Sequence, residues 1–357
     1  MPEGKPFIKC GQLFDCQNPF DDNPDKSVLF SEALNESLRW HLTHCDDYRA
    51  FMAENGFIGD NSLYLPEQIP PILVDVLNNY KLTSVPDKQI KYTVLTENNS
   101  DVSDRKLILD ARSYKRLLKI YESIFNYFGF VEHKQKVNYL CLTYDSKYEN
   151  DLNGNFYYDI LTSLTAHRSV YYGIRFNKNK IEFKFDLEAV SKKIIDFSTH
   201  PEPVRIIGSY FYLNKICDWF ENNKIELKLN RKSCIFIFNE PEFIISNNSF
   251  KKRIENIFGI NVENIRNILI FPNQGIPYIE CKNGNYHLPI YSKAYALEPE
   301  TLLPVSDGDK GLLCLVTPYL TGYPANSILT DYKTIIGNCD CDCGIKSRTF
   351  KLLNSGI

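Results

Sequence analysis

Apolar residues in the first third of the chain recur at helical spacing. Between residues 27 and 56 they stand three or four positions apart, which predicts an amphipathic helix followed by a second, short helix ending at Gly56. Regular structure is then interrupted by Pro66, Pro70 and Pro71. Residues 91–95 alternate as a strand does, and residues 110–128 show the spacing of another helix.

The middle of the chain alternates between two patterns. Short apolar runs rich in Val, Ile, Tyr and Phe predict buried strands over residues 137–143, 169–174, 204–208 and 233–238. Helical patterns separate them over residues 186–197, 210–222 and 249–257. This alternation predicts an α/β fold in which helices cover both faces of a sheet.

The last third of the chain is expected to be rich in β-structure. Strands are predicted over residues 289–297 and 311–317, on either side of a turn at residues 306–309. We therefore expect three segments. They are an N-terminal helical arm and connector (1–90), a layered α/β core (91–275) and a β-rich C-terminal subdomain (276–357).

Composition narrows the class of protein. The 41 basic and 44 acidic side chains give a formal charge of −3, and no block of like charge stands out, so we expect no nucleic-acid partner. No run of about 18 apolar residues occurs, so we expect no membrane span. The 11 cysteines are an odd number in a chain too long to need disulfides, which favours a reducing, cytoplasmic location.

Cysteines cluster near the end of the sequence. The run NCDCDCG contains Cys339, Cys341 and Cys343, and a Cys-x5-His pair, Cys281 and His287, stands upstream. Alternate residues of an extended segment point to one side, so two or three thiolates can converge on one ion. A structural zinc site made by Cys281, His287, Cys341 and Cys343 is one interpretation, with Cys339 able to exchange for one ligand.

Two other interpretations of these cysteines stay open. In the first interpretation, the cysteines are free thiols, Cys281 is buried and His287 is a packing residue. In the second, one of them is a nucleophile that accepts an acyl group, although Asp340 and Asp342 disfavour the thiolate that this needs. Among the other histidines, His41 and His44 are expected on the solvated side of the first helix.

Several segments resemble one family in the order in which they occur. They are HLTHCDDYRAFMAENG (41–56), IPPILVDVLNNYKLTS (69–84), DARSYKRLL (110–118), RIIGSYFYL (205–213), HLPIYSKAYALEPETLLPVSDGDKGLL (287–313) and YPANSILTD (323–331). Together they resemble the acyl-protein synthetases of the LuxE type, a branch of the adenylate-forming enzymes that includes phenylacetate-coenzyme A ligases. The resemblance implies the large-domain fold of these enzymes, with mixed sheets sandwiched by helices and a β-rich C-terminal part. The small C-terminal lid is expected to be absent or vestigial.

The family activates a carboxylic acid with ATP and Mg²⁺ and passes the acyl group to a thiol. The resemblance implies a phosphate loop at residues 96–103, with Thr96 and Ser100 as phosphate-binding positions, and a ribose-binding acid at Asp331. The loop has no glycine, and its two acids add negative charge beside a polyphosphate. Counting back from His287, the glutamate of the family motif falls on Asn273. By this resemblance, Ser100 and Asn273 occupy the family's catalytic motif positions. At Asn273, a neutral amide replaces a carboxylate that the family has near the metal.

These departures favour a family member that has lost efficient adenylation and acts as an acyl-handling or partner-binding subunit. The alternative is an active, ATP-dependent acyl-protein synthetase, in which case ATP and Mg²⁺ are cofactors. By resemblance, the expected partner is an acyl-carrying protein or a reductase or transferase subunit.

Overall fold

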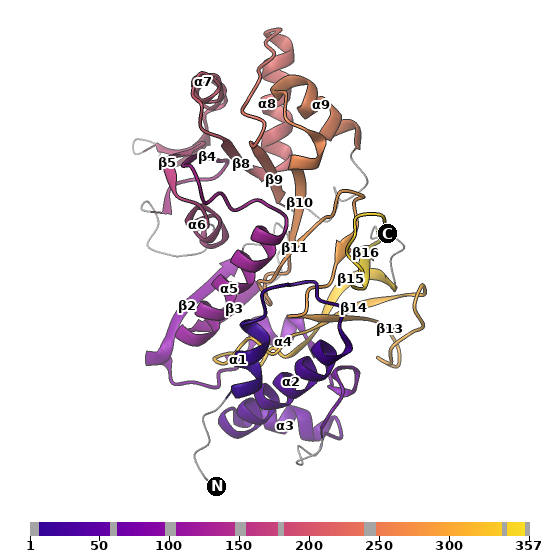
Figure 1. Cartoon of the computed structure of the whole chain (residues 1–357). Helices are drawn as coiled ribbons and strands as arrows, with labels where there is room; N and C mark the ends of the chain where they lie inside the picture. The colour runs from indigo at the N-terminus through magenta and orange to yellow at the C-terminus, as the bar shows by residue number, and fades with distance from the viewer. Residues whose placement is uncertain are drawn as a thin grey trace. The chain divides into compact units, whose positions relative to one another are not determined.

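The computed structural model describes residues 7–57, 63–96, 105–146, 155–177, 182–238, 248–337 and 341–353. The chain forms two compact units (Figure 1). The first unit contains residues 1–127 together with residues 271–357, and the second contains residues 128–270. Because the first unit joins both ends of the chain, it does not coincide with the three consecutive segments expected from the sequence. That division stays a prediction.

The first unit begins with helices. They are α1 (Ile8–Phe14), α2 (Pro24–His44) and α3 (Asp46–Glu54), so the two consecutive helices predicted over residues 27–56 are confirmed. Helix α2 starts where Pro24 fixes the backbone and the side chain of Asn23 accepts a hydrogen bond from the Asp25 N–H at 3.0 Å. Its inward face buries Phe30, Leu34 and Leu38.

A short connector leads to a hairpin and a long helix. The connector contains β1 (Ile72–Leu73) and α4 (Val74–Asn79), which the sequence pattern did not predict. Strands β2 (Ile90–Thr96) and β3 (Arg105–Asp110) pair antiparallel. Helix α5 (Ala111–Tyr127) follows directly, and the Asp110 carboxylate accepts a hydrogen bond from the Ser113 N–H at 3.1 Å in its first turn. The strand and the helix predicted in this region are confirmed.

The C-terminal part of the first unit is a sheet in the order β12-β16-β15-β14-β13. Its strands are β12 (Tyr286–His287), β13 (Lys293–Leu297), β14 (Lys310–Val316), β15 (Ser327–Gly337) and β16 (Thr349–Leu352), and β11 (Pro277–Ile279) precedes them. Strand β1 adds to β15 in parallel, with Ile72 opposite Ile328. The expected β-rich C-terminal part is therefore present, although β13 begins only after Pro289.

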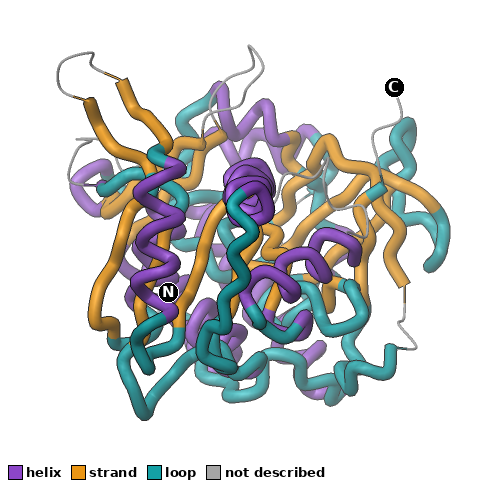
Figure 2. Tube along the Cα trace, turned by 90° about the horizontal axis from the view of Figure 1, so that it is seen from above, coloured by secondary structure: helices purple, strands orange, loops and turns teal. Residues whose placement is uncertain are grey.

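The second unit has a parallel sheet in the order β10-β9-β8-β4-β5. Its strands are β4 (Val137–Cys141), β5 (His167–Tyr172), β8 (Val204–Ser209), β9 (Cys234–Phe238) and β10 (Ile265–Ile270), beside a hairpin of β6 (Ile174–Asn177) and β7 (Glu182–Phe185). Its helices are α6 (Phe156–Ser163), α7 (Leu187–Ser198), α8 (Tyr210–Asn222) and α9 (Asn248–Phe258). Strands and helices alternate along most of this unit; Figure 2 draws the helices in purple and the strands in orange.

Helices lie on both faces of this sheet. Leu140 of β4 belongs to a core that includes Ile194 of α7, Ile216 of α8 and Ile254 of α9. Successive side chains of a strand point to opposite faces, and Tyr139 accordingly donates its hydroxyl to the Leu161 carbonyl of α6 at 3.1 Å. The predicted α/β arrangement of this region is confirmed.

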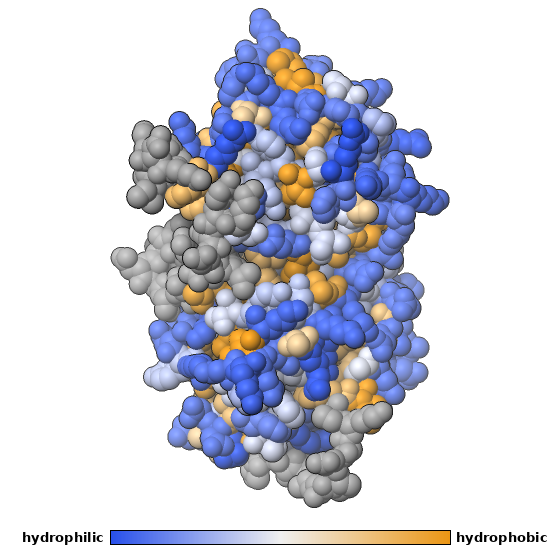
Figure 3. Space-filling model, turned by 90° about the vertical axis from the view of Figure 1, so that its left-hand side faces the viewer, coloured by the Kyte–Doolittle hydropathy of each residue, from blue (hydrophilic) through white to orange (hydrophobic). Residues whose placement is uncertain are grey.

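The surface is predominantly polar on the face shown in Figure 3, where apolar residues occur in small scattered groups. Within the described ranges, no helix has both the length and the apolar character needed to cross a bilayer.

Candidate functional site

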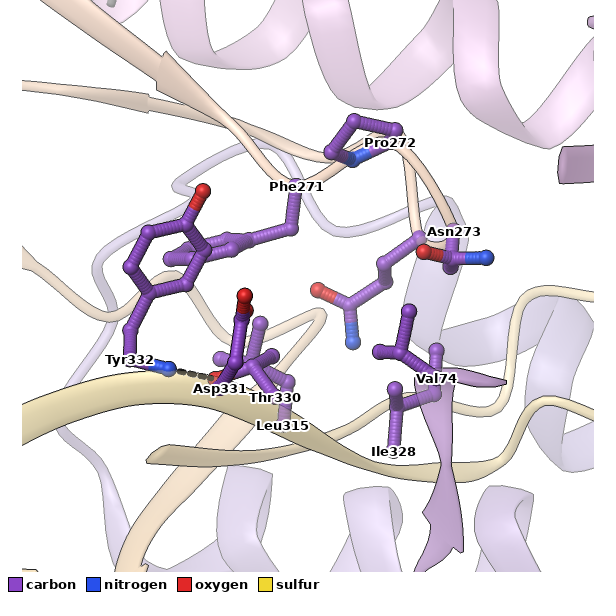
Figure 4. Close-up of a pocket in the computed structure, with 10 residues that line it drawn as sticks. Val74, Phe271, Pro272, Asn273, Leu315, Ile328, Thr330, Asp331 and Tyr332 are labelled. Carbon is purple, nitrogen blue, oxygen red and sulfur yellow. Dashed lines mark hydrogen bonds between the residues drawn. The ribbon is translucent and has the colours of Figure 1, made fainter. Parts of the chain in front are cut away.

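A small pocket that opens to solvent lies in the first unit (Figure 4). Strand β15 supplies Ile328, Thr330, Asp331 and Tyr332, the turn after β10 supplies Phe271, Pro272, Asn273 and Gln274, and Val74 and Leu315 complete the lining. The rings of Phe271 and Tyr332 contact each other with centroids 5.7 Å apart. The pocket thus has an apolar base and polar groups contributed by two separate segments.

Asp331, the acid expected to bind ribose, lines this pocket. It is exposed on β15, next to the buried Thr330. Thr330 accepts a hydrogen bond through Oγ1 from the Tyr332 N–H at 3.3 Å, the dashed line of Figure 4. A carboxylate in this position can accept hydrogen bonds from the hydroxyl groups of a ligand.

The turn at residues 271–275 is fixed by its backbone. The N–H groups of Gln274 and Gly275 both donate to the Phe271 carbonyl, at 2.9 and 2.7 Å. Gly275 has φ +75°, a conformation that residues with a side chain seldom adopt. The tight turn presents the adjacent amides of Asn273 and Gln274 from a rigid backbone.

The Asn273 side chain is engaged inside the unit. Its Nδ2 donates to Asn78 Oδ1 at 2.9 Å and to the Lys106 carbonyl at 3.1 Å, and the residue is 3% exposed. Figure 4 shows this nitrogen pointing away from Asp331. The residue at the predicted motif position therefore ties the turn to α4 and β3.

Gln274 is a pocket residue that the sequence did not indicate. It is fully buried and lines the pocket. Its Oε1 accepts a hydrogen bond from the Tyr278 hydroxyl at 2.9 Å, whereas its Nε2 has no hydrogen-bond partner within the part of the chain that the structure describes. The only available signal was a pair of amides before a glycine, and that pattern is typical of many ordinary turns.

Some predicted positions cannot be compared with the structure. Thr96 is the last residue of β2, but its side chain is not described, and Ser100 lies outside the described residues with the rest of the segment 97–104. Cys339 also lies outside them. Their predicted roles stay predictions.

The structure brings Cys281, His287, Cys341 and Cys343 together. Their ligand atoms all lie within 4.8 Å of one another. The sulfurs of Cys281 and Cys341 are 3.6 Å apart, and His287 Nε2 lies 3.2 Å from the Cys343 sulfur. Ligands about 2.0–2.3 Å from a tetrahedral zinc lie about 3.3–3.8 Å from one another. The separation of the two sulfurs falls within this range, and the separation of His287 Nε2 from the Cys343 sulfur lies just below it.

Two local features orient this cluster. His287 Nδ1 lies 3.1 Å from the Ser347 carbonyl, so this nitrogen donates and Nε2 is left as the metal-binding atom. The loop that carries Cys281 closes on itself, because the Cys281 N–H donates to the Asn285 carbonyl at 2.8 Å and Gly284 adopts φ +79°. The contact between His287 and Ser347 holds the loop of residues 281–287 close to residues 341–347.

The Cys341 thiol has a pKa lowered to about 5. Burial opposes ionisation, but hydrogen bonds from the backbone and side chain of Cys343, from His287 and from Asn285 outweigh it. The sequence argument that the flanking acids disfavour a thiolate therefore omitted these contacts. A thiolate at this position suits a metal ligand.

His41 is a case in which the expectation from the sequence was wrong. It is fully buried, with Nδ1 2.7 Å from Ser84 Oγ and Nε2 3.1 Å from the Leu320 carbonyl. Burial lowers its pKa to about 3, although the Leu320 contact favours the charged form. His44, one turn later, is exposed as expected.

Comparisons with known proteins agree with the fold. The sequence model of the family "Acyl-protein synthetase, LuxE" matches residues 12–356. A long-chain-fatty-acid–luciferin-component ligase of Aliivibrio fischeri is 24% identical over 313 residues, which cover 86% of this chain and 79% of the relative.

Solved structures of adenylate-forming ligases show the same architecture. A 2-hydroxyisobutyryl-CoA ligase in an open conformation superposes with a TM-score of 0.69 at 14% identity, covering 94% of this chain and 76% of that one. A long-chain-fatty-acid-CoA ligase from Archaeoglobus fulgidus gives 0.53 at 7% identity, covering 75% and 52%. The predicted fold class is confirmed, and the family match over nearly the whole chain leads to one conclusion: this chain belongs to the LuxE family of acyl-protein synthetases.

Proposed function

We propose that this chain is an acyl-handling LuxE-family subunit that keeps a nucleotide pocket at Asp331 but forms acyl-adenylates inefficiently. The observation that carries the proposal is the engagement of Asn273. The family motif calls for a carboxylate near the metal at this position, and here a neutral amide donates to Asn78 and to the Lys106 carbonyl.

The electrostatics of the pocket support this reading. Mg²⁺ requires oxygen ligands, and a carboxylate is the usual protein contribution. Among the described residues that line the pocket, Asp331 is the single carboxylate, and in our proposal its role is to hold the ribose hydroxyls. ATP would bring Mg²⁺ on its phosphates, but the protein would offer that ion little charge. Loss of one stabilising contact of this kind commonly costs about 10²–10³ in rate.

An active synthetase is the second candidate. It is favoured by the family match over residues 12–356 and by the Aliivibrio fischeri relative, which is itself a ligase. In that case ATP and Mg²⁺ are cofactors, and an acyl-adenylate would pass its acyl group to a thiol. Both candidates share an acyl-carrying protein, or a reductase or transferase subunit, as the partner.

We also propose a structural zinc ion bound by Cys281, His287, Cys341 and Cys343. Three thiols and one imidazole are a common zinc set, and the His287 Nδ1 contact with Ser347 leaves Nε2 free to coordinate. Such an ion would join the loop after β11 to the segment before β16. Its role would be to stabilise this part of the first unit.

Pyrophosphate exchange tests the proposed function. Purified protein, ATP, Mg²⁺ and a panel of fatty and aromatic acids should give acid-dependent exchange at least about 10²-fold slower than an active family member. Exchange at a comparable rate would support the active synthetase and contradict inefficient adenylation. An omitted-acid reaction serves as the background.

A further inference from the structure

Gln274 has an unusual hydrogen-bond state. The residue is fully buried, yet its Nε2 has no partner among the described residues, and the side chain lines the pocket that contains Asp331. Buried polar groups are nearly always hydrogen-bonded, because an unpaired donor loses its bonds to water without replacement. A buried donor that faces a pocket is therefore expected to meet its acceptor in a bound molecule.

The opposite end of the amide is held by a chain of hydroxyl groups. Tyr278 Oη lies 2.9 Å from Gln274 Oε1 and 3.0 Å from Ser292 Oγ. Because Oε1 can only accept and Tyr278 has one proton, Tyr278 donates to Gln274 and Ser292 donates to Tyr278. This chain directs both hydrogens of Nε2 away from Tyr278.

The backbone of Gln274 is also immobilised. Its N–H donates to the Phe271 carbonyl at 2.9 Å, and its own carbonyl accepts a hydrogen bond from the Tyr319 hydroxyl. The next carbonyl, that of Gly275, accepts from the Tyr121 hydroxyl at 3.2 Å. A donor held in this way needs little reorganisation when a ligand binds.

We propose that Gln274 Nε2 donates a hydrogen bond to an oxygen acceptor of the nucleotide, and that Tyr278 and Ser292 are positioning residues for this donor. The inference rests on the nucleotide pocket of the proposed function. It adds that recognition combines an anionic acceptor, Asp331, with a neutral donor, Gln274. That pair suits a ligand that carries both hydroxyl groups and an oxygen acceptor, as a ribosyl phosphate does.

The test is calorimetric titration with AMP, and with ATP and Mg²⁺. Gln274→Glu preserves the shape but replaces the donor with an acceptor, so AMP affinity should fall about tenfold or more at pH 7.5. Gln274→Met removes the polar group at similar length and should also weaken binding. Gln89→Glu makes the same change at an exposed position of the first unit and should leave affinity unchanged.

Two further measurements separate a binding role from a structural one. AMP affinity of Gln274→Glu should recover as the pH is lowered, because a protonated carboxyl can donate. Tyr278→Phe frees the amide to turn over and should weaken AMP binding about threefold to tenfold, with the melting temperature recorded for each variant.

The outcomes are distinct. Wild-type affinity in both Gln274→Glu and Gln274→Met, while the wild-type chain binds AMP, overturns the inference and leaves the nucleotide pocket standing. A wild-type chain that binds neither AMP nor ATP overturns the pocket and the inference together. Tenfold weaker binding in Gln274→Glu that pH restores supports both.

Discussion

The side-chain amides of Asn273 and Gln274 serve opposite purposes although the two residues are adjacent. Asn273 Nδ2 donates to two groups inside the unit, Asn78 Oδ1 at 2.9 Å and the Lys106 carbonyl at 3.1 Å. Gln274 Nε2 has no partner in the described ranges, and its side chain lines the pocket. In this turn, Asn273 holds the wall of the pocket in place, and Gln274 can donate to a ligand.

Restoring a carboxylate at position 273 should not restore adenylation. In Asn273→Asp, an acid would face Asn78 Oδ1 and the Lys106 carbonyl, two acceptors that it cannot satisfy. We expect the free energy of unfolding to fall by about 1–3 kcal/mol and pyrophosphate exchange to stay at the level of the parent chain. Urea unfolding and the exchange assay measure both effects.

A matched control is Asn23→Asp, since Asn and Asp are equally good N-cap residues and Asn23 is exposed. Its unfolding free energy should change little. An Asn273→Asp chain with the parent's stability and increased exchange would contradict our account of the turn.

Asp331→Ala should weaken ATP binding about tenfold or more, because a charge-assisted hydrogen bond to a ribose hydroxyl is lost. Calorimetry measures the change. Asp309→Ala removes an exposed carboxylate from a turn of the same unit and should have no effect. Unchanged affinity in Asp331→Ala would show that this acid no longer holds a nucleotide.

Protein purified without added metal should contain about one zinc ion per chain, as measured by elemental analysis. Cys341→Ser should lose most of the metal and lower the melting temperature, because a structural site contributes folding free energy directly. Cys16→Ser, which changes a cysteine outside the cluster, should keep both metal and stability. A metal content well below one per chain in the parent would contradict the zinc site.

The free energy of unfolding should fall as the pH is lowered, and His41 should account for part of this fall. Its pKa drops from 6.5 to about 3 on folding, so the unfolded chain binds the additional proton between these values. The His41 contribution is therefore present above about pH 6.5 and is lost as the pH falls toward 3, by at most about 1.4 kcal/mol per pH unit.

Unfolding free energies measured between pH 5 and 7.5 test this dependence. His41→Gln removes the titrating group and should flatten the curve, whereas the exposed His44→Gln should leave its slope unchanged. Equal slopes in the parent and His41→Gln would contradict the assignment.

Gly208→Ala should destabilise the second unit. A Cβ atom at this position would lie 2.4 Å from Cβ of Leu142, the residue that follows β4, and overpacking of this kind costs about 1–3 kcal/mol. Gly11→Ala is the control, because the Cβ there meets nothing within 4 Å and the site is helical. That control should be neutral or slightly stabilising.

The sequence predicted those elements whose pattern is local. Periodicity gave α2, α3 and α5 and the alternating strands and helices of the second unit. It did not give β1, because a two-residue strand is defined by its partner, and Ile72 pairs with Ile328 far along the chain. His41 was misplaced for the same reason, since its partners Ser84 and Leu320 belong to distant segments.

The candidate site divides in a similar way. Cysteine and histidine are few and chemically distinctive, so their spacing, taken with the family resemblance, indicated the four residues that the fold brings together. Amides are common, and nothing in the sequence separates Asn273, whose Nδ2 is hydrogen-bonded, from Gln274, whose Nε2 has no partner among the described residues. Their difference arises from Asn78, Lys106 and Tyr278, which reach the turn only after the chain has folded.

The first unit consists of two separate stretches of the chain, residues 1–127 and 271–357, which are synthesised at different times. Residues 128–270 are contiguous, so all strands of the second unit leave the ribosome before β15 has been translated. Strand β1, made long before, has no parallel neighbour until Ser327–Gly337 emerges. A nascent chain stalled at residue 320 should therefore protect the second unit from protease while leaving Ile72–Asn79 open to cleavage.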